Sequence, residues 1–300
     1  MRGEFGIHLA AHYGMCFGVR DALKAAERVS AERPATILGE LVHNEVVQER
    51  LRGLGVQSGE LAGAEAATRD VIVTAHGAAD RDRVRWREAG YAVTDTTCPL
   101  VRKAHLALAQ LVAEGCLPVI IGKRGHVEVN GLVGDFPEAR IVLSDEEVEA
   151  LPFSEKIGVV SQTTQPIERV EALVGKIRKR HPGAKVIFKD TVCQPTKNRQ
   201  KALLDLCLAV DLVLVVGGSN SNNTWQLVEK ARRCGCRAER VARPEEIREH
   251  WLYGTSAVGV TAGTSTLRET VDEVVARLEE LGGVCEGPSF PKRTVEGGVR

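Results

Sequence analysis

The sequence predicts an α/β protein with mainly parallel sheets, built from three similar units. Along the whole chain, short apolar runs typical of strands alternate with longer runs whose apolar residues recur at helical spacing. Strands that alternate with helices favour parallel sheets covered by helices. A cysteine followed by a helix also occurs three times, at Cys16, Cys98 and Cys193, and 300 residues are enough for three small domains.

The first unit, expected over residues 1–97, begins with a strand at Ile7–Tyr13. After Cys16, the apolar positions between Val19 and Val29 follow helical spacing and predict a helix. The other elements expected here are a strand ending in the loop Leu41–Asn44, a helix to about Leu54, the strand Val71–Thr74, a charged helix over Asp80–Ala89 and the short strand Tyr91–Val93.

The second unit, expected over residues 98–192, opens at Cys98. Pro99 suits the first position of a helix, because its missing N–H would have no partner there. Cys98 would then lie at the positive end of the helix dipole, where a thiolate is favoured. The elements that follow are the helix Val101–Ala113, the strand Leu117–Ile121, a polar turn over Gly122–Glu128, the strand Ile157–Val160, the helix Glu168–Arg180 and the strand Val186–Phe188.

The third unit, expected over residues 193–284, opens at Cys193 in the same way. Its expected elements are the helix Thr196–Ala209, the strand Leu212–Val216, a helix ending near Cys234, a second helix near Glu245–Trp251, the strand Ala257–Val260 and the helix Leu267–Leu281. Residues 285–300 form a C-terminal tail rich in glycine, proline and charged residues, for which we expect no ordered structure.

Polar loops follow the cysteines at nearly constant distances. The pairs that lie 27 or 28 residues apart are Cys16 with His43, Cys98 with His126, and Cys193 with Ser221. A second set of loops, carrying His76, Thr163 and Ser265, lies further on at more variable distances. Ligands of parallel α/β sheets bind beyond the carboxyl ends of the strands, where these loops occur. Three units around a common centre would therefore bring the three cysteines and the polar loops together.

Three separated cysteines in equivalent positions favour an iron–sulfur cluster over zinc. Structural zinc usually draws on close pairs of ligands, and none of the three cysteines belongs to such a pair. A cluster is itself a scaffold several ångströms across, so its ligands can come from distant segments. Three thiolates on four irons would leave one iron able to bind a substrate oxygen and deliver electrons. The close pair of Cys234 and Cys236 has no partner pair and is weak evidence for zinc.

The loops favour an anionic substrate such as a phosphate or diphosphate. They carry neutral or weakly basic donors near glycines and helix starts, where backbone N–H groups add partial positive charge. These donors are His43, His76, His126, Thr163, Ser221, Asn223 and Ser265. Glu128 is the one carboxylate expected at these loop tips. Shielded from water near a cluster, it could hold its proton and act as an acid.

The composition argues against several other classes of protein. The chain has 40 basic and 40 acidic residues, so we expect no binding to nucleic acid or to an anionic membrane surface. No apolar run approaches the roughly 20 residues of a membrane span, and the N-terminus lacks the apolar segment of a secretory signal. We therefore expect a cytoplasmic protein whose 8 cysteines are packing residues or ligands rather than disulfides.

Eight short motifs occur in order between Tyr13 and Leu281. They are Gly14–Val19, Leu41–Asn44, Ala75–Gly77, Thr97–Val101, Gly125–Val129, Gln162–Thr164, Asn198–Gln200 and Ala262–Ser265. Each motif is weak alone, but together and in this order they are specific. On these motifs the chain resembles the 4-hydroxy-3-methylbut-2-enyl diphosphate reductase (LytB) family, whose members catalyse the last step of the non-mevalonate isoprenoid route.

The resemblance implies a trefoil of three pseudo-equivalent α/β domains around a central 4Fe-4S cluster. It implies that Cys16, Cys98 and Cys193 hold the cluster and that the fourth iron binds the substrate hydroxyl. The residues implied to hold the diphosphate are His43, His76, His126, Ser221, Asn223 and Ser265, with Asn222 at a further position of that set. The implied catalytic residues are Glu128, which would relay protons, Thr163 and His126. Two electrons, from a ferredoxin or flavodoxin, and two protons would remove water and yield isopentenyl and dimethylallyl diphosphates.

Four positions depart from the pattern of the family. The family usually has proline at the positions of Val127 and Leu267, alanine at that of Pro195 and serine at that of Asn222. Two alternative hypotheses stay open on this evidence. One is a paralogue with the same cluster that acts on another phosphorylated or allylic substrate. The other is a metal-binding redox sensor without turnover.

Overall fold

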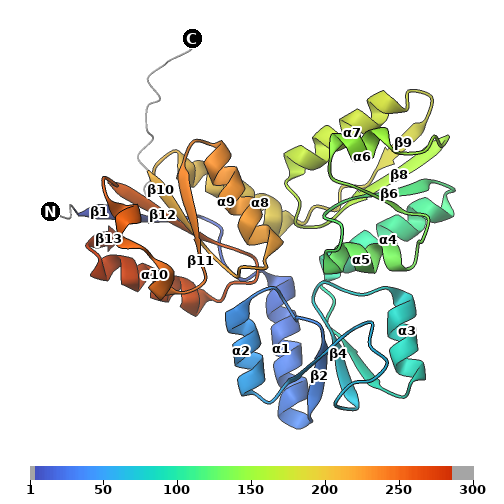
Figure 1. Ribbon diagram of the computed structural model, residues 1–300, viewed down its shortest axis with the longest axis horizontal. Helices are drawn as coiled ribbons and strands as arrows, with labels where there is room; N and C mark the ends of the chain where they lie inside the picture. Colours follow the sequence, from blue (N-terminus) through green and yellow to red (C-terminus); the bar gives the residue numbers. More distant parts are fainter. Residues whose placement is uncertain (1–3, 286–300) are drawn as a thin grey trace. The chain divides into compact units, whose positions relative to one another are not determined.

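The structure, a computed structural model, describes residues 4–285 and contains three parallel β-sheets (Figure 1). The predicted α/β class with parallel sheets is therefore confirmed. The chain divides into two compact units. The two-sheet unit comprises residues 17–42 and 47–196, and the described part of the one-sheet unit comprises residues 4–16, 43–46 and 197–285.

Sheet 1 of the two-sheet unit has the strand order β3-β2-β4-β5. Its strands are β2 (Ala35–Leu38), β3 (Gln57–Gly59), β4 (Asp70–Val73) and β5 (Ala92–Asp95), and its helices are α1 (Phe17–Glu32), α2 (Glu45–Gly53) and α3 (Asp80–Glu88). Figure 1 shows α1 and α2 on one side of this sheet and α3 on the other. Trp86 of α3 is buried against Leu38 and Val71, which fixes α3 on the sheet.

Sheet 2 of the same unit has the order β7-β6-β8-β9. Its strands are β6 (Leu117–Ile121), β7 (Arg140–Val142), β8 (Lys156–Ser161) and β9 (Lys185–Phe188), and its helices are α4 (Pro99–Ala113), α5 (Val127–Gly134), α6 (Asp145–Glu149) and α7 (Ile167–Arg180). Side chains alternate along β6: Val119 and Ile121 pack in the core under α7, whereas Ile120 packs in the core under α4 and α5. Both faces of the sheet are thus buried, as expected for parallel strands.

The one-sheet unit contains sheet 3, with the order β11-β10-β12-β1-β13. Its strands are β1 (Phe5–Leu9), β10 (Leu212–Val216), β11 (Arg237–Val241), β12 (Ala257–Ala262) and β13 (Gly283–Cys285), and its helices are α8 (Gln194–Cys207), α9 (Asn222–Arg233) and α10 (Arg268–Glu280). Leu212 and Leu214 of β10 pack in the core under α10, and Val213 packs in the core under α8 and α9.

The first four strands of sheet 3 are arranged like those of sheets 1 and 2, and β13 adds a fifth. Each cysteine follows the fourth strand in the order given for its sheet. Cys98 follows β5, Cys193 follows β9, and Cys16 follows β1, which lies beside β12. The strand predicted to begin the first unit therefore belongs to sheet 3, because the apolar run at its position pairs with β12 and β13 rather than with β2. The predicted limits after residues 97, 192 and 284 otherwise stay predictions.

Several local predictions need correction. The helix expected near Glu245–Trp251 is two short 3-10 turns, η1 (Pro244–Glu246) and η2 (Glu249–Leu252). Strand β2 ends at Leu38, before the predicted loop Leu41–Asn44, since Gly39 adopts a φ of 111° that turns the chain. Residues 286–300 of the predicted tail lie outside the described residues. Within the described chain, no helix is both long and apolar enough to cross a membrane.

Candidate functional site

Cys98 is the N-cap of α4 in the two-sheet unit, as the sequence predicts. Its φ of −53° and ψ of 133° are non-helical, and Pro99 is the first residue of the helix. The backbone N–H of Cys98 donates to the carbonyl of Ala75 at 3.1 Å, which anchors the cysteine to the end of β4. A sulfur at this position faces the positive end of the helix dipole, which favours the thiolate form that binds metals.

The Cys98 sulfur packs against a glycine of α1. A Cβ atom added to Gly18, in the first turn of α1, would lie 2.3 Å from Cys98 Sγ. Any side chain at Gly18 would therefore displace the sulfur. Soft thiolate donors fit an iron–sulfur cluster.

Cys193 lies directly before α8, also in the two-sheet unit. Its backbone N–H donates to the carbonyl of Thr163 at 2.9 Å, and its sulfur is 3.1 Å from the hydroxyl oxygen of Thr196. Thr196 is fully buried in the first turn of the helix. Thr196 was not among the predicted site residues, although its spacing of three residues from Cys193 is that of a residue that can reach back to a helix start.

Glu128 and Thr163 form a buried pair in the two-sheet unit. Their exposed fractions are 2% and 4%. The Glu128 carboxylate accepts the backbone N–H of Thr163 at 2.7 Å and its hydroxyl at 3.1 Å. Burial raises the pKa of Glu128 to about 7, although the two hydrogen bonds from Thr163 act in the opposite direction. Glu128 therefore exists as both acid and carboxylate near neutral pH.

The position of Glu128 differs from the predicted polar turn. Helix α5 begins at Val127, so Glu128 lies in its first turn rather than at a loop tip. The helix starts early because His126 is a good N-cap: its Nδ1 accepts the backbone N–H of Glu128 at 3.1 Å. An imidazole that accepts at Nδ1 carries its proton, when neutral, on Nε2, which is then available as a donor. The rings of His76 and His126 make an edge contact, with centroids 5.6 Å apart.

Cys16 is anchored in the one-sheet unit. Its backbone N–H donates to the carbonyl of Thr264 at 3.0 Å, so the loop after β1 is fixed to the loop after β12. Gly14, two residues earlier, has a φ of 73° that favours glycine. The carbonyl of Gly14 accepts a hydrogen bond from the buried guanidinium of Arg199. The sequence analysis identified Arg199 only as part of a motif; its contact with residue 14 links positions far apart in the chain.

The predicted serine and asparagine donors gather at the carboxyl ends of β10 and β12, in the one-sheet unit. Ser221 is the N-cap of α9, and its hydroxyl accepts the backbone N–H of Thr224 at 3.2 Å. The hydroxyl of Ser265 donates to the carbonyl of His43 at 3.3 Å. Within the described residues, the buried Nδ2 atoms of Asn222 and Asn223 have no hydrogen-bond partner. The N-terminus of α9 therefore offers donors without protein acceptors, as an anion site does.

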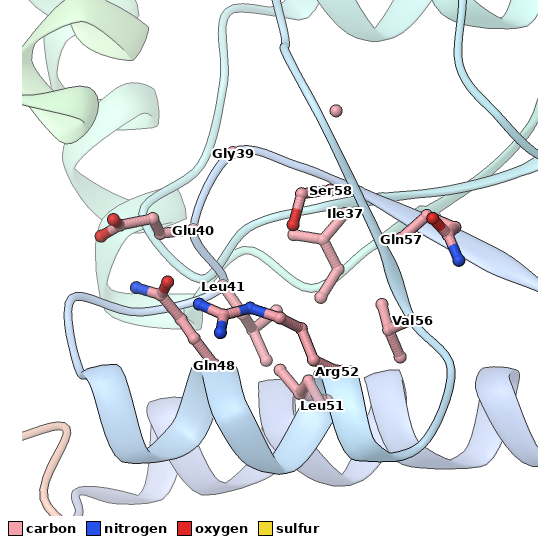
Figure 2. A pocket seen from close by; sticks show the side chains of 11 residues that line it. Ile37, Gly39, Glu40, Leu41, Gln48, Leu51, Arg52, Val56, Gln57 and Ser58 are labelled. Carbon is pink, nitrogen blue, oxygen red and sulfur yellow. The ribbon is translucent and has the colours of Figure 1, made fainter.

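A separate cavity of about 250 Å³ lies in the two-sheet unit between α2 and the carboxyl ends of β2 and β3 (Figure 2). Figure 2 shows Gln48, Leu51 and Arg52 of α2 on one side of it and Ile37 and Ser58 on the other. None of the predicted site residues lines this cavity. It therefore has no part in the chemistry suggested by the cysteines and Glu128.

Comparison with known proteins agrees with this geometry. The model of the family described as "LytB protein" matches residues 7–279. The chain belongs to the LytB protein family. Similar curated LytB relatives include 4-hydroxy-3-methylbut-2-enyl diphosphate reductase 2 of Burkholderia mallei, which is 35% identical over 95% of this chain and 91% of its own. The 4-hydroxy-3-methylbut-2-enyl diphosphate reductase of Aquifex aeolicus is 34% identical over 94% of this chain and 97% of its own.

Solved structures of such enzymes have a similar fold. The E-1-hydroxy-2-methyl-but-2-enyl-4-diphosphate reductase from Plasmodium falciparum matches with a TM-score of 0.88 and 25% identity, over 97% of this chain and 96% of its own. The predicted resemblance to the LytB family is therefore confirmed.

The four departures from the family pattern fit the local structure. Val127 is the first residue of α5, and Pro195 lies in the first turn of α8, where proline is tolerated. Leu267 is the N-cap of α10 and is 9% exposed, so it packs rather than binds. Asn222 is the first residue of α9 and replaces a hydroxyl donor with an amide donor. Only the change at Asn222 alters a group that a ligand could contact.

Proposed function

We propose that this chain reduces 4-hydroxy-3-methylbut-2-enyl diphosphate and removes its hydroxyl group as water, giving isopentenyl and dimethylallyl diphosphates. Curated LytB relatives that carry this enzyme name align with nine-tenths or more of the chain. The structural observation that carries the proposal is the buried Glu128–Thr163 pair. An acid with a pKa of about 7 next to a cysteine-bearing segment is what a proton-coupled reduction near neutral pH requires.

Cys16, Cys98 and Cys193 would hold a 4Fe-4S cluster through three thiolates. When bound, the cluster would supply the two electrons of the reduction. Each of the three cysteines follows the fourth strand of its sheet, and each has its backbone N–H bound to a carbonyl of the same unit. The backbone of each cysteine is therefore held within its own unit before any group binds, which lowers the entropy that it loses on binding.

Glu128 would donate the proton that turns the leaving hydroxyl into water. Its Oε1 accepts the backbone N–H of Thr163, so the carboxyl proton belongs on Oε2, which lies 3.1 Å from the Thr163 hydroxyl. In the acid form, Oε2–H can donate to Thr163 Oγ1, and the threonine hydroxyl can then donate to a substrate oxygen. The pair would thus act as a relay. Thr163 also contacts Cys193 through its carbonyl, which ties the relay to a cluster ligand.

Each unit, taken by itself, carries donors of the kind that a diphosphate needs. In the one-sheet unit these are Ser221, Asn222, Asn223 and Ser265, together with His43. In the two-sheet unit they are His76 and His126. The Nδ1 of His126 accepts from the backbone, so its Nε2 carries the proton of the neutral ring. Neutral donors and the N-terminus of α9 suit a ligand whose charge is spread over several oxygens.

The reaction balances with two electrons and two protons. The C–O bond to the allylic hydroxyl breaks, one proton forms water with that hydroxyl, and the second proton adds to the allyl carbon skeleton. A ferredoxin or flavodoxin as electron donor and a cytoplasmic location are further parts of the proposal, and they rest on the resemblance and on the sequence.

An anaerobic turnover assay tests the proposal. The purified protein, with a low-potential reductant, is given 4-hydroxy-3-methylbut-2-enyl diphosphate, and the two C5 diphosphates are quantified. Formation of both products supports the proposed function. A protein with full iron and sulfide content that makes neither product would favour a paralogue with another substrate. A protein that binds one zinc and no sulfide would favour the redox sensor.

A further inference from the structure

The buried arginine of α3, Arg83, contacts the segment that carries Cys98. Arg83 is 6% exposed. Two of its nitrogens donate hydrogen bonds, Nη1 to Asp80 at 2.7 Å and Nη2 to the Thr97 hydroxyl at 3.1 Å. Nε forms an ion pair with Asp95 at 3.0 Å, without the geometry of a hydrogen bond. A guanidinium is the side chain suited to such a fixed set of contacts, because its donors are planar and always protonated.

Thr97, directly before Cys98, is held by these contacts on several sides. Since arginine can only donate, the hydroxyl of Thr97 accepts from Arg83 and directs its own proton to Asp95. The backbone N–H of Thr97 also donates to Asp95, at 2.9 Å. The methyl group of Thr97 faces Gly77, whose added Cβ would lie 3.1 Å from it. The next residue is the N-cap of α4, so the direction of the Cys98 side chain depends on how residue 97 is held.

We infer that Arg83 is a positioning residue, which acts through Asp95 and Thr97 to hold Cys98 in the geometry of a cluster ligand. The inference rests on the proposed function for the identity of the bound group, but the contacts themselves lie entirely within the two-sheet unit. Groups that orient a metal ligand without touching the metal typically change metal affinity about 10- to 100-fold when they are removed.

A second arginine on the same carboxylate provides a matched control. Arg102 lies 2.8 Å from Asp95 Oδ2, but its side chain is 56% exposed, and no hydrogen bond from it to Thr97 is seen among residues 4–285. Arg83→Gln and Arg102→Gln therefore each remove one positive charge that contacts Asp95 Oδ2. Only the first removes the contact with Thr97.

The test compares Arg83→Gln, Arg102→Gln, Thr97→Val and Thr97→Ser with the wild-type protein. Thr97→Val keeps the shape and loses the hydroxyl, whereas Thr97→Ser keeps the hydroxyl and loses the methyl group. Two readouts are measured: the rate at which anaerobically purified protein loses iron to a chelator, and the rate of Cys98 alkylation in iron-free protein, by peptide mass spectrometry. Alkylation of Cys193 in the same samples reports general loosening, and the electron paramagnetic resonance spectrum of the reduced protein reports cluster geometry.

We expect Arg83→Gln and Thr97→Val to lose iron about 10-fold faster or more. We expect faster alkylation of Cys98 and unchanged alkylation of Cys193 in both, an altered spectrum, and wild-type behaviour in Thr97→Ser and Arg102→Gln. If Arg83→Gln does not fold, the two Thr97 variants decide the matter. Three results would overturn the inference. The first is wild-type rates of iron loss and alkylation in Thr97→Val, and the second is an equal effect of the two arginine variants. The third is alkylation that becomes faster to the same extent at Cys98 and Cys193. Wild-type protein without a cluster would refute the proposed function, while the alkylation rates would still decide on Arg83.

Discussion

Glu128→Gln tests the proposed proton donor with little change in shape. Glutamine keeps an Oε1 that can accept the backbone N–H of Thr163, which donates to Glu128 at 2.7 Å in the wild type. Its amide nitrogen can donate to the Thr163 hydroxyl, which lies 3.1 Å from Oε2. The substitution therefore keeps both contacts with Thr163, and we expect the variant to fold and to bind the cluster and the substrate.

The size of the effect follows from the environment of Glu128. General acid catalysis contributes about 10²- to 10⁴-fold, so turnover should fall by that factor, equivalent to about 3 to 5 kcal/mol in the barrier. Burial raises the pKa of Glu128 to about 7, and the reactive acid form is lost as the pH rises through that value. With half of the molecules protonated at pH 7 and about a tenth at pH 8, wild-type turnover should fall roughly fivefold between these pH values.

The assay measures anaerobic turnover of the wild type, Glu128→Gln and the exposed control Glu149→Gln across this pH range, with iron content determined for each. Glu149 is 70% exposed on α6, and we expect its variant to behave like the wild type. Turnover should fall with rising pH in the wild type but not in Glu128→Gln. Turnover of Glu128→Gln close to that of the wild type, or the same loss with rising pH in both, would refute the argument.

Three further predictions concern the surroundings of the site. Gly18→Ala should lower the iron content of the purified protein, because the added Cβ would lie 2.3 Å from the sulfur of Cys98. Thr163→Val should raise the pKa of Glu128, because the hydroxyl of Thr163 donates a hydrogen bond that lowers this pKa. The turnover that remains in the variant should therefore be lost at a higher pH than in the wild type. Asn223→Ala should raise the KM for the diphosphate substrate about 10-fold or more with little effect on the unfolding midpoint, since its buried amide nitrogen has no protein partner in the described chain.

Controls separate these effects from general damage. Gly175 lies in the middle of α7, and a Cβ added to it would meet no atom within 4 Å. Gly175→Ala should therefore keep its iron and gain about 0.5 to 1 kcal/mol of stability. Normal iron content in Gly18→Ala, an unshifted pH profile in Thr163→Val, or an unchanged KM in Asn223→Ala would each count against the corresponding step.

Local sequence signals predicted two central strands and the helix that follows Cys98. Strands β6 and β10 have the predicted bounds, since continuous apolar runs buried on both faces leave little ambiguity. Helix α4 begins at Pro99 with Cys98 as its N-cap, because a proline at the first helical position and a following apolar stripe are both local features. The predicted sulfur position therefore followed from residues 95–102 alone.

Features that depend on distant contacts were predicted less well. The sheet that β1 joins is set by pairing with β12, about 250 residues later, and no local pattern encodes that choice. The edge strands β3, β7 and β11 are partly exposed and lack an apolar run, so no strand was predicted there. The role of Arg83 could not be predicted for the same reason. In the sequence of this charged helix it resembles its exposed neighbours, and only its contacts with Asp95 and Thr97 distinguish it.

The content of iron and acid-labile sulfide in anaerobically purified protein tests the central claim most directly. We expect about four irons and four sulfides per chain, and their loss in Cys16→Ser, Cys98→Ser and Cys193→Ser. Cys234→Ser, at an exposed cysteine outside the site, should keep them. A wild-type chain without sulfide, or full iron and sulfide in any of the three ligand variants, would contradict the account.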